Sequence, residues 1–132
     1  MQKYINSFKV KTKNIKILDT KTDIQKVLKE SEILITDYSS VYMDFAYMNK
    51  PVMYFQFDYE EYRKRQYQDG YFSYKDDGFG PVCDNAEDLI KDFISITKKG
   101  LDKKYCDRMN KFFELKDQNN CDRIYDLFKG DR

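Results

Sequence analysis

The segment "ILITDYSSVYMDFAYMNKPVMYF", residues 33–55, contains the signals for a strand, a helix and a second strand. Residues 33–36 are a short apolar run without alternation, which is typical of a strand covered on both faces. Apolar residues at helical spacing then predict a helix over 39–48, and Pro51 ends it because proline disfavours helical geometry in the residue before it. Residues 52–57 are the next predicted strand.

The flanking sequence continues this alternation of strands and helices. Residues 14–19 predict an earlier strand, and Thr22 supplies the N-cap of a helix that ends near Glu30. On the other side, Asn85 caps a helix through about Lys99, and two amphipathic helical segments follow. Strand, helix, strand, helix, strand is the βαβ pattern. It predicts an α/β fold with a Rossmann-like parallel sheet and flanking helices.

Residues 58–82 differ in character from the rest of the chain. They are rich in tyrosine and charge and contain several glycines, so they predict a long loop with short helical pieces. Gly78 and Gly80 are expected to serve backbone turns. A further strand of the sheet would come from this region or from residues 1–10.

Length and charge limit the classes of function. The chain of 132 residues is predicted to be one domain, residues 1–132, with a net charge of +1 from 24 basic and 23 acidic residues. This balance argues against a strong electrostatic nucleic-acid binder. Histidine is absent from the sequence, so the usual neutral-pH base and the commonest metal ligand are missing. We expect no metal and no cofactor.

The cysteines and the apolar runs indicate the compartment. Cys83, Cys106 and Cys121 are odd in number and widely spaced, so we expect neither a disulfide framework nor a zinc site. The reducing cytoplasm is the expected location. The apolar runs are far shorter than the roughly 20 residues that a membrane span needs. A soluble protein is therefore expected, and attachment to a membrane surface stays open.

The turn from Thr36 to Ser40 lies between a predicted strand and a predicted helix. Ligands of open α/β sheets bind beyond the carboxyl ends of the strands, and a helix N-terminus there favours an anion. Ser39 and Ser40 add hydroxyl donors, and Asp44, one turn further, could accept hydrogen bonds from a ribose. These residues predict a nucleotide-diphosphate site. The alternative is structural: Ser39 caps its own helix and Asp44 faces solvent.

The segment "EEYRKRQY", residues 60–67, adds two candidate phosphate ligands. Arg63 or Arg65 could neutralise the phosphates of a ligand or a polyanionic acceptor, and the alternative is a charged loop that faces water. The tyrosines of this region would pack the loop down or contact a partner: Tyr59, Tyr62, Tyr67, Tyr71 and Tyr74.

Two segments resemble sequence blocks of a known family. "SEILITDYSSVYMDFAYMNKPVMYF", residues 31–55, and "GYFSYKDDGFGPV", residues 70–82, are similar to blocks of the CDP-glycerol glycerophosphotransferase family, which primes or polymerises teichoic acids. Two blocks in the right order are more specific than either alone, and the resemblance covers roughly residues 14–98. Ser73 departs from the pattern, which has an acidic residue at this position.

The resemblance implies a GT-B architecture of two Rossmann-like lobes. This chain would be the C-terminal, nucleotide-binding lobe, ending in two or three helices, without the N-terminal acceptor lobe. The donor would be CDP-glycerol or a related CDP-polyol, which is a substrate and not a cofactor. Ser39 and Ser40 would hold its pyrophosphate, and Asp44 its ribose. The turn itself would be shaped by Thr36, Asp37 and Tyr38.

The resemblance also implies an activity for the full-length protein. It would transfer glycerol phosphate, or a related polyol phosphate such as ribitol phosphate, to a teichoic-acid or related cell-surface polymer. It would be cytoplasmic and peripheral on the inner face of the bacterial cell membrane. The family relies on histidines for catalysis, and this chain has none, so we expect no catalytic residue in it. We expect an excised lobe that is inactive alone, and a degenerate relative is the alternative.

Two other functions stay open on the sequence. A nucleotide-sugar glycosyltransferase or UDP-sugar epimerase would use the same architecture and would favour UDP or another nucleotide. A non-catalytic interaction module would instead dock onto another protein through the tyrosine-rich loop.

Overall fold

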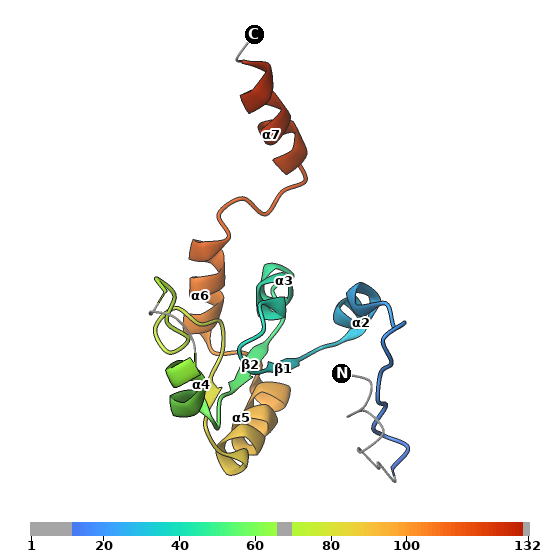
Figure 1. Ribbon diagram of the computed structural model, residues 1–132, viewed down its shortest axis with the longest axis vertical. Helices are drawn as coiled ribbons and strands as arrows, with labels where there is room; N and C mark the ends of the chain where they lie inside the picture. The colour runs from blue at the N-terminus through green and yellow to red at the C-terminus, as the bar shows by residue number, and fades with distance from the viewer. Residues whose placement is uncertain (1–11, 66–69, 131–132) are drawn as a thin grey trace. The chain divides into compact units, whose positions relative to one another are not determined.

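The computed structural model of the protein describes residues 12–65 and 70–130. The chain divides into two units, Met1–Ser31 and Glu32–Arg132 (Figure 1). The predicted strand within residues 1–10 lies outside the described residues.

The first unit contains helix α2, Ile24–Glu30. The predicted N-cap was wrong by one residue: Asp23 caps the helix and accepts a hydrogen bond from the N–H of Lys26 at 3.2 Å. The Thr22 hydroxyl donates instead to Asp19 Oδ1 at 3.0 Å. Asp23 is the better placed cap because its carboxylate reaches the third residue of the helix.

The predicted strand at residues 14–19 is not formed. Residues 12–31 contain no strand that could pair with it, and Ile15 and Ile17 are 58% and 42% exposed. A strand is stabilised by hydrogen bonds to a neighbouring strand and by cross-strand side-chain contacts, so an apolar run without a partner does not become one.

The second unit is built on a three-stranded parallel sheet in the order β1-β2-β3. The strands are Leu34–Thr36, Val52–Phe55 and Val82–Cys83. Leu34 lies opposite Val52, and Tyr54 lies opposite Val82. The predicted α/β class with a parallel sheet is confirmed. The third strand does not lie at residues 14–19 but begins at the end of the 58–82 region, one of the two places expected to add a strand.

The described part of this unit has five helices: α3, Val41–Tyr47; α4, Tyr59–Arg65; α5, Ala86–Lys99; α6, Lys103–Phe112; and α7, Asn120–Lys129. Figure 1 shows α3 and α5 on opposite sides of the strands, as predicted for a parallel sheet. Asn85 caps α5 as predicted, accepting the N–H of Asp88 at 2.9 Å, and Gly100 ends it with φ 81°.

Helix α3 ends earlier than Pro51 requires. Asn49 adopts the left-handed conformation with φ 58°, and its N–H donates to the carbonyl of Ala46 at 2.9 Å. Asparagine tolerates this conformation better than most residues with a Cβ, so the chain turns back towards β2 before the proline.

The central strand β2 is buried on both faces. Val52, Met53 and Tyr54 are each 0% exposed. Met53 packs with Cys83 and Ile96 of α5 on one face. Tyr54 lies on the other face, where its ring contacts that of Tyr42 of α3 at a centroid distance of 5.3 Å. Alternation along the strand therefore supplies both halves of the core.

The strand β1 was predicted to be covered on both faces, and it is only partly so. Ile35 is 44% exposed, because β1 is an edge strand of the sheet in the described residues.

Helix α7 exposes large apolar side chains: Leu127 and Phe128 are 74% and 76% exposed. Among the helices that the structure describes, none is long and apolar enough to cross a membrane.

Gly78 and Gly80 are required by close backbone approach. A Cβ at Gly80 would lie 1.7 Å from the carbonyl oxygen of Val52, and one at Gly78 would lie 2.0 Å from that of Tyr74. Both distances are far below van der Waals contact. The loop before β3 therefore passes against the central strand only because Gly80 has no Cβ, and it turns back on its own backbone at Gly78 for the same reason.

We expect Gly80→Ala to destabilise the protein by about 1–3 kcal/mol, because the new methyl group meets the backbone of a fully buried strand. Urea unfolding followed by circular dichroism measures this change. Gly70→Ala is the matched control, since a Cβ at that position meets nothing within 4 Å. Equal unfolding midpoints for the two variants would show that β2 and the loop can move apart without cost.

Candidate functional site

The turn between β1 and α3 stands at the carboxyl end of the sheet's edge strand. Thr36 is the last residue of β1, and Ser40 occupies the N-cap position of α3. The carboxylate of Asp37 accepts hydrogen bonds from the N–H of Tyr38 at 2.6 Å and from that of Ser39 at 3.2 Å. The side chain of Asp37 therefore stabilises the turn to which it belongs, as expected of an Asx residue in a tight turn.

The two serines are exposed. Ser40 makes no capping hydrogen bond through its side chain, and the Ser39 hydroxyl accepts one from the N–H of Val41 at a long 3.5 Å. Asp44 is also exposed and belongs to the first turn of α3. The serine hydroxyls are therefore not buried as helix caps, and they lie at the protein surface.

Tyr38 holds the turn against the rest of the unit. Its hydroxyl donates to Asp58 Oδ1 at 3.0 Å, and its ring stacks on that of Tyr62 in α4, with centroids 3.5 Å apart and 4° between the planes. The Tyr74 hydroxyl donates to the Tyr38 carbonyl at 3.4 Å. Tyr38 therefore joins the first sequence block to α4 and to the second block.

The hydroxyl of Tyr38 stays protonated at neutral pH. Burial and the hydrogen bond to Asp58 both raise the pKa of Tyr38 above its ordinary value of 10.0. The proton remains on the donor side of the bond, so the contact with Asp58 persists across the physiological range.

Gln56 supplies a further contact that the sequence did not predict. It follows β2 directly and is 3% exposed, the one buried polar residue among the described part of the chain. Its Nε2 donates to the carbonyl oxygen of Asp37 at 3.2 Å. The sequence signal is weak: a single polar residue between the apolar run of β2 and Phe57.

A pocket of about 1090 Å³ opens beside this turn, beyond the ends of β2 and β3. Of the predicted site residues, Tyr38 and Arg63 line it, whereas Ser39, Ser40 and Asp44 do not belong to its lining. The side chain of Arg65 lies outside the described part of the chain.

The charge of this pocket is predominantly acidic. Its lining carries two basic residues, Arg63 and Lys75, and a larger set of carboxylates: Asp58, Glu60, Glu61, Asp84 and Asp88. The guanidinium of Arg63 lies over the ring of Tyr59, 5.9 Å from its centroid. Carboxylates in excess of cations disfavour the binding of an anion in the interior of this pocket.

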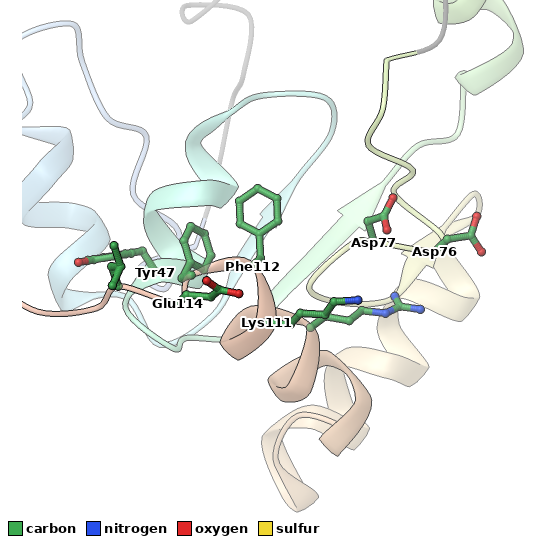
Figure 2. A pocket seen from close by; sticks show the side chains of 9 residues that line it. Tyr47, Asp76, Asp77, Lys111, Phe112 and Glu114 are labelled. Carbon is green, nitrogen blue, oxygen red and sulfur yellow. The ribbon is translucent and has the colours of Figure 1, made fainter.

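A second hollow of about 820 Å³ lies between α6 and the loop before β3. Figure 2 shows Asp76 and Asp77 on the loop, and Lys111 and Phe112 on the helix. Arg108 of α6 donates to the carbonyl oxygens of Lys75 at 3.1 Å and of Gly78 at 3.0 Å. These two hydrogen bonds from Arg108 hold the loop that carries Tyr74 against α6. In the described residues there is no group of acidic, cysteine or histidine side chains that could hold a metal ion.

A Rossmann-like parallel sheet with an exposed polar turn beyond its edge strand defines the class of α/β domain that binds ligands at strand ends. Comparison with known proteins gives the family. The family model described as CDP-glycerol:poly(glycerophosphate) glycerophosphotransferase matches residues 1–129, and the chain belongs to this family.

Curated relatives include three proteins of Bacillus subtilis (strain 168). The minor teichoic acid biosynthesis protein GgaB is 38% identical over 84% of this chain and 12% of its own length. The teichoic acid poly(glycerol phosphate) polymerase is 36% identical over 57% of the chain and 10% of its length. The teichoic acid glycerol-phosphate primase is 34% identical over 71% and 24%. The chain thus spans a minor part of each relative.

Two solved structures of the wall teichoic acid polymerase TagF share the fold. A His-to-Ala variant matches with a TM-score of 0.72 and 24% identity, over 99% of this chain and 33% of that one. A His-to-Asn variant with CDPG matches with a TM-score of 0.60 and 25% identity, over 85% and 28%. The predicted resemblance and fold class are confirmed by these matches.

We expect Tyr38→Phe to lower the free energy of unfolding by about 1 kcal/mol, the usual scale of one hydrogen bond, because the contact with Asp58 is lost while the stack on Tyr62 is kept. Urea denaturation gives the value. Tyr71→Phe removes a hydroxyl from a ring that is 91% exposed and should leave the stability unchanged. Identical denaturation curves for the two variants would show that the hydroxyl of Tyr38 does not stabilise the turn.

Proposed function

We propose that this chain is the donor-binding lobe of a glycerophosphotransferase that uses CDP-glycerol and extends or primes a teichoic-acid or related cell-surface polymer. The match of the family model over residues 1–129 carries the proposal. The relatives that support it act on teichoic acids by name, and the chain covers only a part of each.

The donor would lie across the turn between β1 and α3. Ser39 and Ser40 would donate hydrogen bonds to the pyrophosphate, and Asp44, one helical turn along, would accept those of the ribose hydroxyls. The exposure of Ser39 and Ser40 and the absence of a capping bond from the Ser40 side chain support the assignment of the serines. Thr36, Asp37 and Tyr38 would give the turn its shape, with no side chain of theirs on the phosphates.

Arg63 is a second candidate for contact with a phosphate or with the acceptor, and Arg65 is the third. The acidic surroundings of Arg63 favour a contact at the rim of the pocket, where an anion is still partly solvated. In this arrangement the arginine would neutralise charge on the polymer more readily than on a donor that lies on the serine turn.

The reaction would be the attack of an acceptor hydroxyl on the phosphorus next to glycerol. The bond between that phosphorus and the oxygen of the CMP moiety breaks, and CMP leaves with the electron pair. Hydrogen bonds from the serine hydroxyls would stabilise the charge that develops on the phosphates. The chain contains no histidine, so the base that takes the acceptor proton would come from another lobe of the full-length protein.

The transferred polyol is open between glycerol and ribitol phosphate. A poly(ribitol-phosphate) polymerase of Bacillus spizizenii is 38% identical over 52% of the chain, a similarity comparable to that of the glycerol enzymes. The full-length protein would act at the inner face of the bacterial cell membrane as a peripheral protein, where a lipid-linked acceptor is accessible.

The nucleotide site is tested by binding of CDP to the chain. We expect amide shifts in NMR spectra that centre on residues 36–44. Ser40→Ala should weaken the affinity by on the order of 1 kcal/mol, or more if the lost bond is to a charged phosphate. Asp44→Ala should reduce the preference for CDP over inorganic pyrophosphate, because only the former has a ribose. Asp122→Ala, in the first turn of α7, is the matched control.

Three results would contradict the site or its donor. Shifts that avoid residues 36–44 would place the nucleotide elsewhere or show that the turn is only structural. Equal or tighter binding of UDP would favour a nucleotide-sugar glycosyltransferase or epimerase. Absence of binding by any nucleotide would leave the interaction module as the better description.

We also expect the chain alone to release no CMP from CDP-glycerol in the presence of a lipid-linked acceptor, because it has no histidine to act as the base. Chromatography of the products measures the release. Binding of CDP to the same sample is the control that the site is intact. Release above background that needs the folded chain would show that its own residues suffice for catalysis.

A further inference from the structure

The turn that carries the serines contacts the rest of the unit through Tyr38 and the carbonyl of Asp37. Ser39 and Ser40 are exposed, and the internal bonds from Asp37 fix only the first two peptide units. A turn held in this way still needs an external anchor to keep its orientation relative to the sheet. The anchors come from residues at alternate positions beyond the middle of β2.

Tyr54 and Gln56 are two residues apart, the period of a strand, and Asp58 lies two residues further, in the turn that precedes α4. The N–H of Gln56 still pairs with the carbonyl of Cys83 at 2.8 Å, so the backbone remains extended beyond the last assigned residue of β2. The three side chains reach separate partners on the neighbouring segments. Tyr54 Oη accepts from the N–H of Phe79 at 3.2 Å, Gln56 donates to Asp37, and Asp58 accepts from Tyr38.

The burial of the Gln56 side chain makes its hydrogen bond to the turn necessary. It is 3% exposed, and burial of an amide is unfavourable unless its hydrogen bonds are made. Its bond to the Asp37 carbonyl, at 3.2 Å, satisfies part of that requirement. The same bond fixes the peptide unit that begins the turn, since the carbonyl of Asp37 and the N–H of Tyr38 belong to one plane.

We infer that Gln56 is a positioning residue for donor binding. Its amide holds the Asp37–Tyr38 peptide plane and thereby orients the N–H groups and hydroxyls of Ser39 and Ser40 towards the phosphates of the donor. The inference rests on the proposed function for its consequence, but the positioning itself is a property of the free chain. A residue of the same length without a donor, such as methionine, would fill the space and release the turn.

The first measurement is hydrogen exchange of backbone amides in Gln56→Met. We expect the amides of residues 38–41 to exchange about three- to tenfold faster than in the unaltered chain, the change that one hydrogen bond gives in a local opening equilibrium. Asp102→Ala is the control: it removes the N-cap of α6, which accepts the N–H of Lys104 at 2.9 Å, and leaves the turn untouched. Exchange in the control should rise in α6 only.

The second measurement is affinity for CDP in the same two variants, at a temperature where both are folded. Gln56→Met should weaken CDP binding by about three- to tenfold with the same pattern of shifted amides, whereas Asp102→Ala should bind as the unaltered chain does. A residue that only stabilises the fold would alter the unfolding midpoint and not the affinity of the folded protein.

The outcomes separate this inference from the proposed function. If exchange at residues 38–41 is the same in Gln56→Met and in Asp102→Ala, Gln56 does not position the turn. If exchange rises but the affinity is unchanged, the turn is anchored by Gln56 and does not hold the donor, which also overturns the inference. If the unaltered chain binds no CDP, the proposed function fails, and without a donor to orient the role of Gln56 in binding fails with it.

Discussion

Burial of β2 on both faces constrains the rest of the second unit. Its backbone pairs with β1 on one side and β3 on the other, and its side chains alternate between α3 and α5. Three consecutive residues without exposed surface leave no room for a change of register, because a shift of one residue would exchange the two faces. Close approach of the backbone at Gly80 is a direct consequence, since the loop before β3 has to pass against the strand.

The residues that directly follow β2 also stabilise the turn between β1 and α3. Gln56, directly after β2, and Asp58, in the turn that precedes α4, both make hydrogen bonds to the turn between β1 and α3. An exposed polar turn is therefore anchored by residues that follow the buried central strand. This arrangement is common at binding sites, where the scaffold fixes a loop and the loop supplies the polar groups.

The aromatic side chains around Tyr38 and Tyr42 connect segments that are distant in the sequence. Tyr62, Tyr74 and Phe79 pack against them from α4 and from the loop before β3. Hydroxyl groups in this cluster find partners, as the bonds of Tyr38, Tyr54 and Tyr74 show. The two sequence blocks shared with the family are thus parts of one structural unit, although about fifteen residues separate them.

The sequence by itself determined the α/β class, the strands at β1 and β2, the helix between them and the cap of α5, because each depends on local periodicity or on a capping side chain. It also located the serine turn between β1 and α3 and indicated the family, whereas the exposure of Ser39 and Ser40 came from the structure. Tertiary structure decided the rest. The apolar run at residues 14–19 matched a strand but has no partner strand within the described residues 12–31. The two residues of β3 are too few to show periodicity and form a strand only because β2 offers them hydrogen bonds. Gln56 became an anchor of the turn for the same reason: its partner, the carbonyl of Asp37, lies 19 residues away and is near only in the folded chain.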